Sequence, residues 1–343
     1  MPHIPANASR WNVCWRTSLG WEENFVETQL LRRVPVSQQW KSKHACELAD
    51  GTLLIMRNRQ GSPIFNANHF DRFVDRGLRV VPVVFGDEDF EDACGAADGR
   101  RLRPRAAALR RIYRRAPLVI RHYWTPACAA RPNVLTVPLG VKGRGHTKAQ
   151  RRRWPRRYAW SFASGHATPL RDAATALLQT AELPGSHSLV YAQSGAAPVG
   201  EDEYSRVLGD SIFALAPTGN VAETWRLTEA LDAGAIPILT GDSAHFRFAG
   251  YPPALVDLFV DVGSLSHRIR RARKLTPSWR GPCADAAECA RSERDAAAAI
   301  TTLRRLLGSG ESELGVRQRR LVNVYEEWQR NWTMRVAERL AAI

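Results

Sequence analysis

The chain has 343 residues, 44% of them hydrophobic and 24% charged, which excludes disorder over most of its length. It exceeds the about 250–300 residues at which a single core stops growing, so two domains are expected. Its formal net charge of +15 favours phosphate-bearing ligands, nucleic acid or anionic lipid as partners. An Arg- and Ala-rich composition would produce the same surplus with no such partner.

Short apolar runs alternate with helix-like stretches in the first part of the chain. Strands that alternate with helices at this spacing predict parallel βαβ units. Strands are expected at 52–56, 78–85, 118–124 and 134–139, and helices at 65–76 and 106–115.

A Gly-rich and then basic stretch, 142–157, interrupts this pattern and is interpreted as an interdomain linker. The same alternation resumes after it, and a long C-terminal helix follows. Strands are expected at 158–164, 211–216 and 235–239, and helices at 171–180, 223–233 and 314–340.

The predicted fold class is therefore α/β with two Rossmann-like domains. We expect an N-terminal domain at residues 1–145 and a second domain at 146–312. Residues 313–343 would form a helix that packs back across both.

Six cysteines are present, without a Cys-x-x-Cys pair or a neighbouring His cluster, which argues against a zinc site. Cys283 and Cys289 could pair in an oxidising compartment. Equally, all six could be buried thiols, which is the alternative we slightly favour.

No run approaches the about 18 apolar residues of a membrane helix, and the first residues show no signal peptide. As the chain stands, this predicts a cytoplasmic protein.

The segment that follows the expected strand 211–216 has the features of an anion site. It leads through the turn residues Thr218, Gly219 and Asn220 into a helix. Ligands of open parallel sheets bind at the carboxyl ends of strands, where a helix N-terminus offers free N–H groups. This geometry suits a diphosphate.

Glu223, Arg226 and Glu229 would lie within about 120° of one another on that helix. A carboxylate accepts hydrogen bonds from ribose hydroxyls, and a guanidinium binds phosphate oxygens as a fork. The same spacing is common on solvated helices, where it contributes a few tenths of a kcal/mol.

The stretch 215–239, LAPTGNVAETWRLTEALDAGAIPIL, resembles the C-terminal signature of exostosin-type glycosyltransferases. That signature runs strand, Pro-x-Gly, an acidic residue with Thr and an aromatic, Arg, Glu-Ala-Leu and Gly-Ala-Ile-Pro. Glu223 stands where the family often has Asp. The resemblance implies that Glu229 holds the ribose and Arg226 the diphosphate.

Weaker matches extend the resemblance. The segment 81–91 resembles the one in which this family places Gly or Ser, Asp and Glu after a strand. Segments 119–124 and 133–140 are similar to the end of the first domain in the ribitol xylosyltransferase branch, and 158–165 is similar to the start of the second, so the resemblance covers about residues 50–240. It implies the GT-B arrangement, in which two Rossmann-like domains face a cleft. It also implies inverting transfer from a nucleotide diphosphate sugar, without a metal or other cofactor.

Such a transfer needs residues that stabilise the leaving diphosphate and a base that deprotonates the acceptor hydroxyl. The departing diphosphate would be stabilised by Arg226, helped by Arg171 or Arg121 and by the turn. Asp87 or Glu88, after the expected strand 78–85, would be the base, although a helix-capping role is at least as frequent for such acids. His122 is an alternative base, and a structural role is the more frequent one for an isolated strand-end histidine. The candidate donor-binding residues are Thr218, Gly219, Asn220, Glu223, Thr224, Arg226, Glu229, Arg171 and Arg121.

Two other functions compete with the active glycosyltransferase. The basic runs at 151–157 and 268–274 suggest nucleic acid or an anionic surface, but no nucleic-acid-binding motif is visible. A catalytically degenerate family member would act as a partner subunit, and the intact Glu223, Arg226 and Glu229 argue against it.

The sequence does not specify the sugar or the acceptor. By resemblance the donor is UDP-linked, with xylose, glucuronic acid, galactose or arabinose as its sugar, and the acceptor is a glycan or related hydroxyl compound. A homodimer is left open. Eukaryotic relatives work in the Golgi lumen behind an anchor, so that compartment is the alternative to the cytoplasm if the gene model lacks its anchor.

Overall fold

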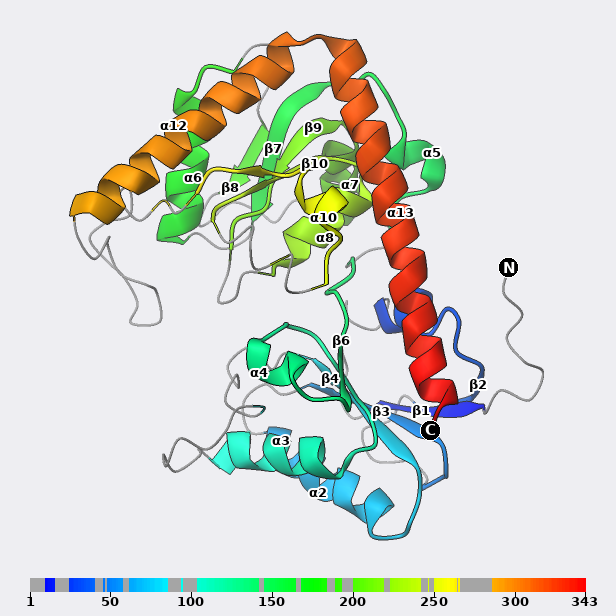
Figure 1. Ribbon diagram of the computed structural model, residues 1–343. Helices are drawn as coiled ribbons and strands as arrows, with labels where there is room; N and C mark the ends of the chain where they lie inside the picture. Colours follow the sequence, from blue (N-terminus) through cyan, green and yellow to red (C-terminus); the bar gives the residue numbers. More distant parts are fainter. Residues whose placement is uncertain are drawn as a thin grey trace. The chain divides into compact units, whose positions relative to one another are not determined.

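The computed structural model describes residues 10–15, 25–40, 46, 48–57, 62–85, 94, 104–141, 145–164, 168–183, 189–192, 200–218, 223–241, 246, 250–263, 265 and 286–343. The chain divides into two compact units (Figure 1). The first unit combines Met1–Leu139 with Gln329–Ile343, and the second is Gly140–Trp328.

The first unit contains a six-stranded sheet with the order β2-β1-β3-β4-β5-β6, and every described pairing in it is parallel. All six residues of β4 are buried, as expected for a strand covered on both faces. Its strands are β1 (Trp11–Trp15), β2 (Val36–Trp40), β3 (Thr52–Arg57), β4 (Val80–Phe85), β5 (Val119–Arg121) and β6 (Val134–Thr136).

Helices α2 (Ser62–Val74) and α3 (Pro104–Arg115) pack together against this sheet. Phe70 and Phe73 of α2 share one core with Leu109 of α3 and with strand residues. The described part of the first unit also contains a short π-helix, η1 (Val26–Leu30), and a short helix, α4 (Pro126–Ala129).

The second unit contains a five-stranded sheet with the order β11-β10-β9-β7-β8, again parallel in every described pairing. Its strands are β7 (Tyr158–Ser164), β8 (Leu189–Ala192), β9 (Ser211–Leu215), β10 (Ile236–Leu239) and β11 (Val260–Asp261). Its helices are α5 (Lys148–Arg151), α6 (Pro169–Thr180), α7 (Glu201–Gly209), α8 (Trp225–Asp232), α10 (Pro253–Val256), α12 (Ala286–Gly308) and the first part of α13 (Glu311–Ala341).

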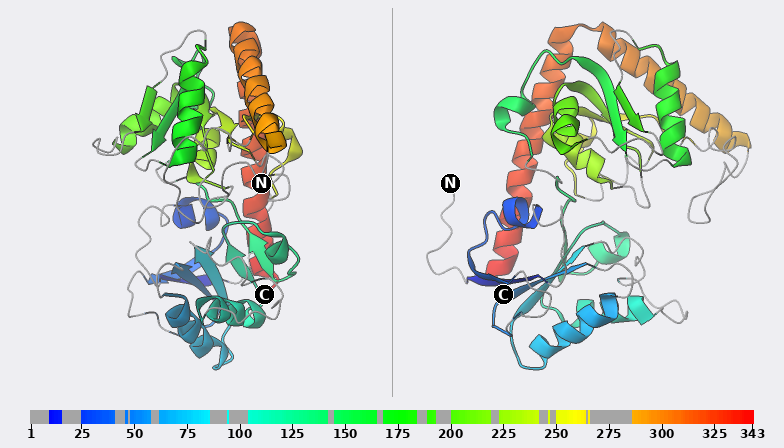
Figure 2. Two further views of the ribbon diagram at one scale, coloured as in Figure 1. Left: turned by 90° about the vertical axis from the view of Figure 1, so that its left-hand side faces the viewer. Right: turned by 180° about the vertical axis from the view of Figure 1, so that it is seen from behind.

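Each of the long helices at the end of the chain is held by side-chain contacts within a unit. Helix α12 lies beside α6 (Figure 2), and Arg304 of α12 donates to the carbonyl oxygen of Ala181, just after α6. In the first unit, Trp332 near the end of α13 stacks on Phe25 with ring centroids 6.0 Å apart. Among the described helices, none is both long and apolar enough to cross a bilayer.

The basic stretch 145–157 is folded onto the second sheet and is not a solvated linker. Arg156 is only 7% exposed and donates hydrogen bonds to the carbonyl oxygens of Ser211 and Ala233 at 2.8 Å each. Burial lowers the pKa of Arg156 to about 10. The guanidinium therefore joins β9 to the end of α8, a role that its place in a basic run does not reveal.

The five cysteines that the structure describes are all in disulfides, so the slightly favoured alternative of six thiols is wrong. Cys14 is bonded to Cys46 and Cys94 to Cys128, and Cys289 is also in a disulfide. The Cα atoms of the first two pairs lie 5.6 and 4.9 Å apart, within the usual range for a bridge. Each of these pairs joins residues more than 30 positions apart, which sequence spacing could not reveal.

Candidate functional site

The order of strands in the second sheet marks where a ligand would bind. Chain order β7, β8, β9, β10, β11 becomes spatial order 8-7-9-10-11, so the direction of winding reverses between β7 and β9. In doubly wound sheets the crevice at the carboxyl ends of the two strands beside this reversal is the usual ligand site. Helices α6 and α8 begin just beyond those two ends.

Each of these helices carries an arginine in its first turn. Arg226 of α8 donates from Nε to the carbonyl oxygen of Ala163 in β7, at 2.7 Å, and its guanidinium lies 5.8 Å from the centroid of the Phe162 ring. Arg171 of α6 has its pKa lowered to about 10, first by burial and then by the charge of Arg226. Two cations held together at helix N-termini create a site that favours an anion.

Glu229 lies one turn after Arg226 and is only 8% exposed. Its Oε2 accepts a hydrogen bond of 2.6 Å from the hydroxyl of Tyr204, in α7. Burial, and then the charge of Glu229, raises the pKa of Tyr204 well above its usual value. The phenol therefore stays protonated and donates to the carboxylate of Glu229.

Glu223 does not share a helical face with Arg226 and Glu229, contrary to expectation. Helix α8 begins at Trp225 with Thr224 as its N-cap, so Glu223 lies before it. Its Oε1 accepts from the Tyr251 hydroxyl at 3.1 Å, and the residue is 4% exposed. Threonine is a good N-cap residue, and this signal inside the expected helix was overlooked.

The two threonines of the predicted site have different surroundings. The backbone N–H of Thr218 donates to Oγ1 of Thr240, at the end of β10, at 3.1 Å. The hydroxyl of Thr224 is buried and has no hydrogen-bond partner within the described chain. Gly219 and Asn220 lie outside the described residues.

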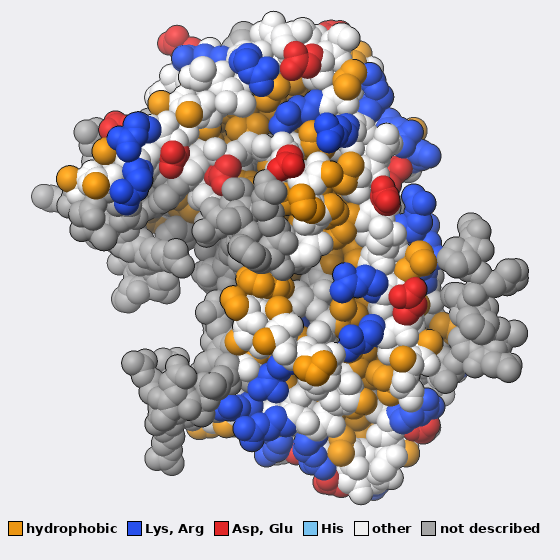
Figure 3. Space-filling view, viewed as in Figure 1, with side chains coloured by type: hydrophobic (Ala, Val, Ile, Leu, Met, Phe, Trp, Pro, Cys, Tyr) orange, Lys and Arg blue, Asp and Glu red, His pale blue; other side chains and the backbone are white. Residues whose placement is uncertain are grey.

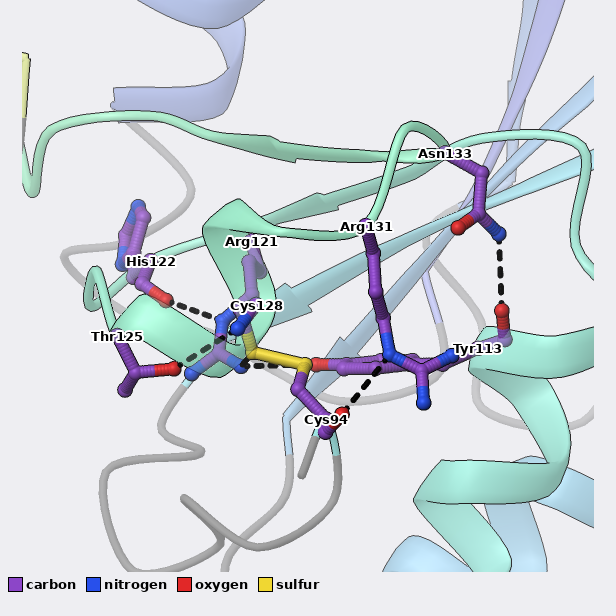
Figure 4. The surroundings of a disulfide bond; sticks show 8 residues. All are labelled: Cys94, Tyr113, Arg121, His122, Thr125, Cys128, Arg131 and Asn133. Atoms are coloured by element: carbon purple, nitrogen blue, oxygen red, sulfur yellow. Dashed lines mark hydrogen bonds between the residues drawn. A yellow bond between two sulfur atoms is a disulfide. The ribbon is translucent and has the colours of Figure 1, made fainter. Parts of the chain in front are cut away.

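Arg121, a further candidate for the diphosphate, is fully buried in the first unit (Figure 4). Its Nε donates to the carbonyl oxygen of His122 at 2.8 Å, and its Nη1 donates to the sulfur atoms of Cys94 and Cys128. The guanidinium lies 5.9 Å from the centroid of the Tyr113 ring. This burial argues against contact between Arg121 and a diphosphate.

His122 follows β5 and is packed among aromatic rings. Its ring centroid lies 4.4 Å from that of Phe85 and 5.1 Å from that of Phe25. Burial, and then the charge of Arg121, lowers the pKa of His122 to about 3. A neutral imidazole of such low basicity is a poor proton acceptor at neutral pH. Asp87 and Glu88, the other candidate bases, lie outside the described residues.

Several of the described arginines form ion pairs with nearby acidic residues. Figure 3 shows Lys and Arg side chains in several separate groups on the visible face. On α3, Arg111 and Arg115 pair with Asp71 at 2.9 and 2.6 Å. The run 268–274 lies outside the described residues. Within the described ranges, no three His, Cys, Asp or Glu side chains come together as a metal site requires.

Sequence reasoning missed Tyr204. The residue lies 25 positions before its partner Glu229, on a helix that was not predicted. Only the packing of α7 beside α8 brings the two together, so no local signal could have identified it.

No protein-family model matches the chain, and no curated protein matches it in sequence, so membership of the exostosin family is not confirmed. Solved structures of similar fold are glycosyltransferases. An α1,3-fucosyltransferase is 11% identical, with a TM-score of 0.45 over 95% of this chain and 83% of that chain. The glycotransferase of kitacinnamycin is 11% identical, with a TM-score of 0.47 over 96% and 98%.

Phytolacca americana UGT2, complexed with UDP-2fluoro-glucose and pterostilbene, is 12% identical, with a TM-score of 0.40 over 93% of this chain and 100% of that chain. The predicted class, α/β with two Rossmann-like parallel sheets, is confirmed by the strand orders.

Proposed function

We propose that the chain is an inverting glycosyltransferase that moves a sugar from a nucleotide diphosphate donor to a hydroxyl of a glycan or related acceptor. The observation that carries this is the placement of Arg171 and Arg226 at the reversal point of the second sheet, with Glu229 one turn beyond. The resemblance of 215–239 to the exostosin signature supports the same assignment and favours a UDP-linked donor.

In this proposal the two guanidiniums bind the diphosphate, and Glu229 accepts hydrogen bonds from the ribose. The hydroxyl of Thr224, at the N-terminus of α8, adds a further donor to a phosphate oxygen. Thr218 and Glu223, which precede α8 in the chain, complete the proposed donor site. A nucleoside diphosphate offers the anion and the vicinal hydroxyls that this set of side chains can pair.

The transfer step follows inverting glycoside chemistry. The bond between the anomeric carbon and the diphosphate oxygen breaks, and both of its electrons leave with the diphosphate. The acceptor oxygen forms the new bond on the opposite face while a base takes its proton. Arg171 and Arg226 stabilise the charge that develops on the leaving group. Asp87 and Glu88 remain the proposed bases, and full turnover in both Asp87→Asn and Glu88→Gln would exclude them.

The disulfides bear on the compartment. Cytosolic thiols are kept reduced, whereas bridges persist in secreted and luminal proteins. The Cys14–Cys46 and Cys94–Cys128 bridges therefore favour an oxidising compartment, such as the Golgi lumen, over the cytoplasm.

Nucleotide binding is the direct test. Thermal unfolding would be followed with UDP, GDP, ADP and CDP, for the wild type and for Glu229→Ala. A ligand that binds only the folded state at about 100 times its Kd adds about 2.7 kcal/mol, a shift of several degrees. We expect one nucleotide to raise the unfolding temperature of the wild type and not that of Glu229→Ala.

Glu201→Ala is the matched control, because Glu201 is an exposed glutamate on α7 of the same unit. It should respond to the nucleotide as the wild type does. If no nucleotide shifts the wild type at millimolar concentration, the donor-site assignment is wrong and a degenerate partner subunit becomes the leading function. If the nucleotide binds, release of the free diphosphate from a panel of its sugars identifies the donor.

A further inference from the structure

Small side chains on neighbouring elements hold the ring of Tyr204 in place. It lies on α7 and packs against a buried cluster that includes Ala214 of β9 and Ala230 of α8. Alanines leave room for an aromatic ring where larger side chains would not. The ring is thereby fixed with its hydroxyl at Glu229.

The hydrogen bond between Tyr204 and Glu229 uses one oxygen of the Glu229 carboxylate and leaves the other oxygen for a ligand. The Tyr204 hydroxyl donates to Oε2 of Glu229 at 2.6 Å. No further hydrogen bond reaches the carboxylate of Glu229 from the described part of the chain, so Oε1 is available to a ligand. The raised pKa of Tyr204 keeps the proton on the phenol, so the direction of the bond is fixed.

Because the Glu229 carboxylate is held by Tyr204, it cannot rotate to another partner when the ligand lacks a ribose hydroxyl. Sites built to hydrogen-bond a hydroxyl reject the analogue that lacks it, because a buried polar group is then left unpaired. A carboxylate free to rotate would find another partner and would discriminate less.

We propose that Tyr204 is a positioning residue that holds Glu229 against the ribose and makes the donor site selective for ribonucleotides over deoxyribonucleotides. The inference rests on the proposed function, because it assigns a role to Tyr204 at the same donor site. It adds a specificity determinant from a helix outside the strand-turn-helix segment that binds the diphosphate.

The test is a double-mutant cycle on nucleotide binding, with Tyr204→Phe, Glu229→Gln and the double variant. The probes are the diphosphate that binds best in the panel of UDP, GDP, ADP and CDP and its 2′-deoxy and 2′,3′-dideoxy forms. Titration calorimetry gives each Kd. We expect Tyr204→Phe to weaken binding of the ribonucleotide about tenfold and binding of the dideoxy form less than twofold. The double variant should bind no worse than Glu229→Gln, because both changes remove one interaction.

Tyr158→Phe is the matched control, since Tyr158 is a buried tyrosine at the start of β7, the opposite end of the strand from the site. It should keep the wild-type ratio of ribo to dideoxy affinity. Equal losses on both probes in Tyr204→Phe, or losses that add to those of Glu229→Gln, would overturn the inference. Should Tyr204→Phe not fold, a wild type that binds ribo and dideoxy forms within threefold would overturn it as well.

The two proposals fail in different ways. A wild type that binds no nucleotide overturns the donor site and this inference together. A wild type that binds, and is weakened by Glu229→Gln but not by Tyr204→Phe, overturns the role of Tyr204 alone.

Discussion

Arg226 lies close enough to Arg171 for its positive charge to lower the pKa of Arg171, in addition to the larger effect of burial. Without an anion, the two guanidiniums repel one another at the reversal point of the sheet. A bound diphosphate would remove this repulsion. Replacing Arg171 with a neutral residue should therefore weaken binding of a diphosphate without lowering the stability of the ligand-free protein.

The first prediction concerns Arg171→Met. We expect the free energy of unfolding without ligand to stay the same or rise by up to about 1 kcal/mol, since a partly buried charge is removed. Affinity for the nucleoside diphosphate should fall about 10- to 100-fold. Urea unfolding and calorimetric titration measure the two effects. Arg320→Met, on the exposed side of α13, is the control and should change neither. Lower stability with unchanged affinity would mean that Arg171 is structural.

The second prediction compares the two N-cap threonines of the site. Oγ1 of Thr168 accepts from the N–H of Arg171 at 3.3 Å, whereas Thr224 makes no such bond. Thr168→Val should therefore lower the free energy of unfolding by about 1 kcal/mol, while Thr224→Val leaves it nearly unchanged. Thr224→Val should instead weaken nucleotide binding several-fold. Equal stability losses in the two variants would contradict this account.

The third prediction tests the role of the basic stretch before β7. Arg156→Met leaves several buried carbonyl oxygens without a donor, so it should lower the free energy of unfolding of the second unit by on the order of 3–5 kcal/mol. Arg157→Met, an exposed neighbour that stacks on Tyr158 at 5.3 Å, should lower it by about 1 kcal/mol or less. Chemical denaturation of both variants gives the comparison. Similar small effects in both variants would support the interpretation of this stretch as an interdomain linker.

The fourth prediction concerns pH and His122. Its pKa is lowered from 6.5 to about 3, so the unfolded chain binds more protons than the native chain between these values. Stability should therefore fall as pH falls below about 6.5. From about pH 7 to about pH 5 the loss due to His122 is about 2 kcal/mol.

His122→Phe, which suits the surrounding rings of Phe25 and Phe85, should remove that part of the pH dependence. Urea midpoints at the two pH values, measured for both proteins, show whether it does. Because the imidazole is neutral and buried, His122→Phe should also retain the transfer rate. An unchanged pH dependence would mean that His122 is protonated in the folded state.

The sequence predicts those parts of the fold that depend on local patterns. Continuous apolar runs identified β3, β4 and β9, and helical spacing identified α3 and α13. Strand β2 was missed because Ser37, Gln38 and Gln39 are exposed and interrupt any apolar run. Helix α12 was missed because its many alanines carry little periodic signal.

The candidate site divides in the same way. Arg226 and Glu229 are recognisable because they lie in one short segment. The order of strands brings Arg171 close to Arg226, and helix packing brings Tyr204 to Glu229. The disulfides likewise depend on neighbouring strands and loops. Contacts between distant segments are set by tertiary structure, which local patterns do not encode.

Helix α13 also determines when the first unit can finish folding. Residues 329–343 at its end belong to that unit, and Trp332, Val336 and Leu340 are buried there. The second unit, by contrast, is one continuous stretch of chain, Gly140–Trp328. On the ribosome, at about 5–20 residues per second, the first unit must wait on the order of tens of seconds for its last helix. The domain that is made first should be the domain that is completed last.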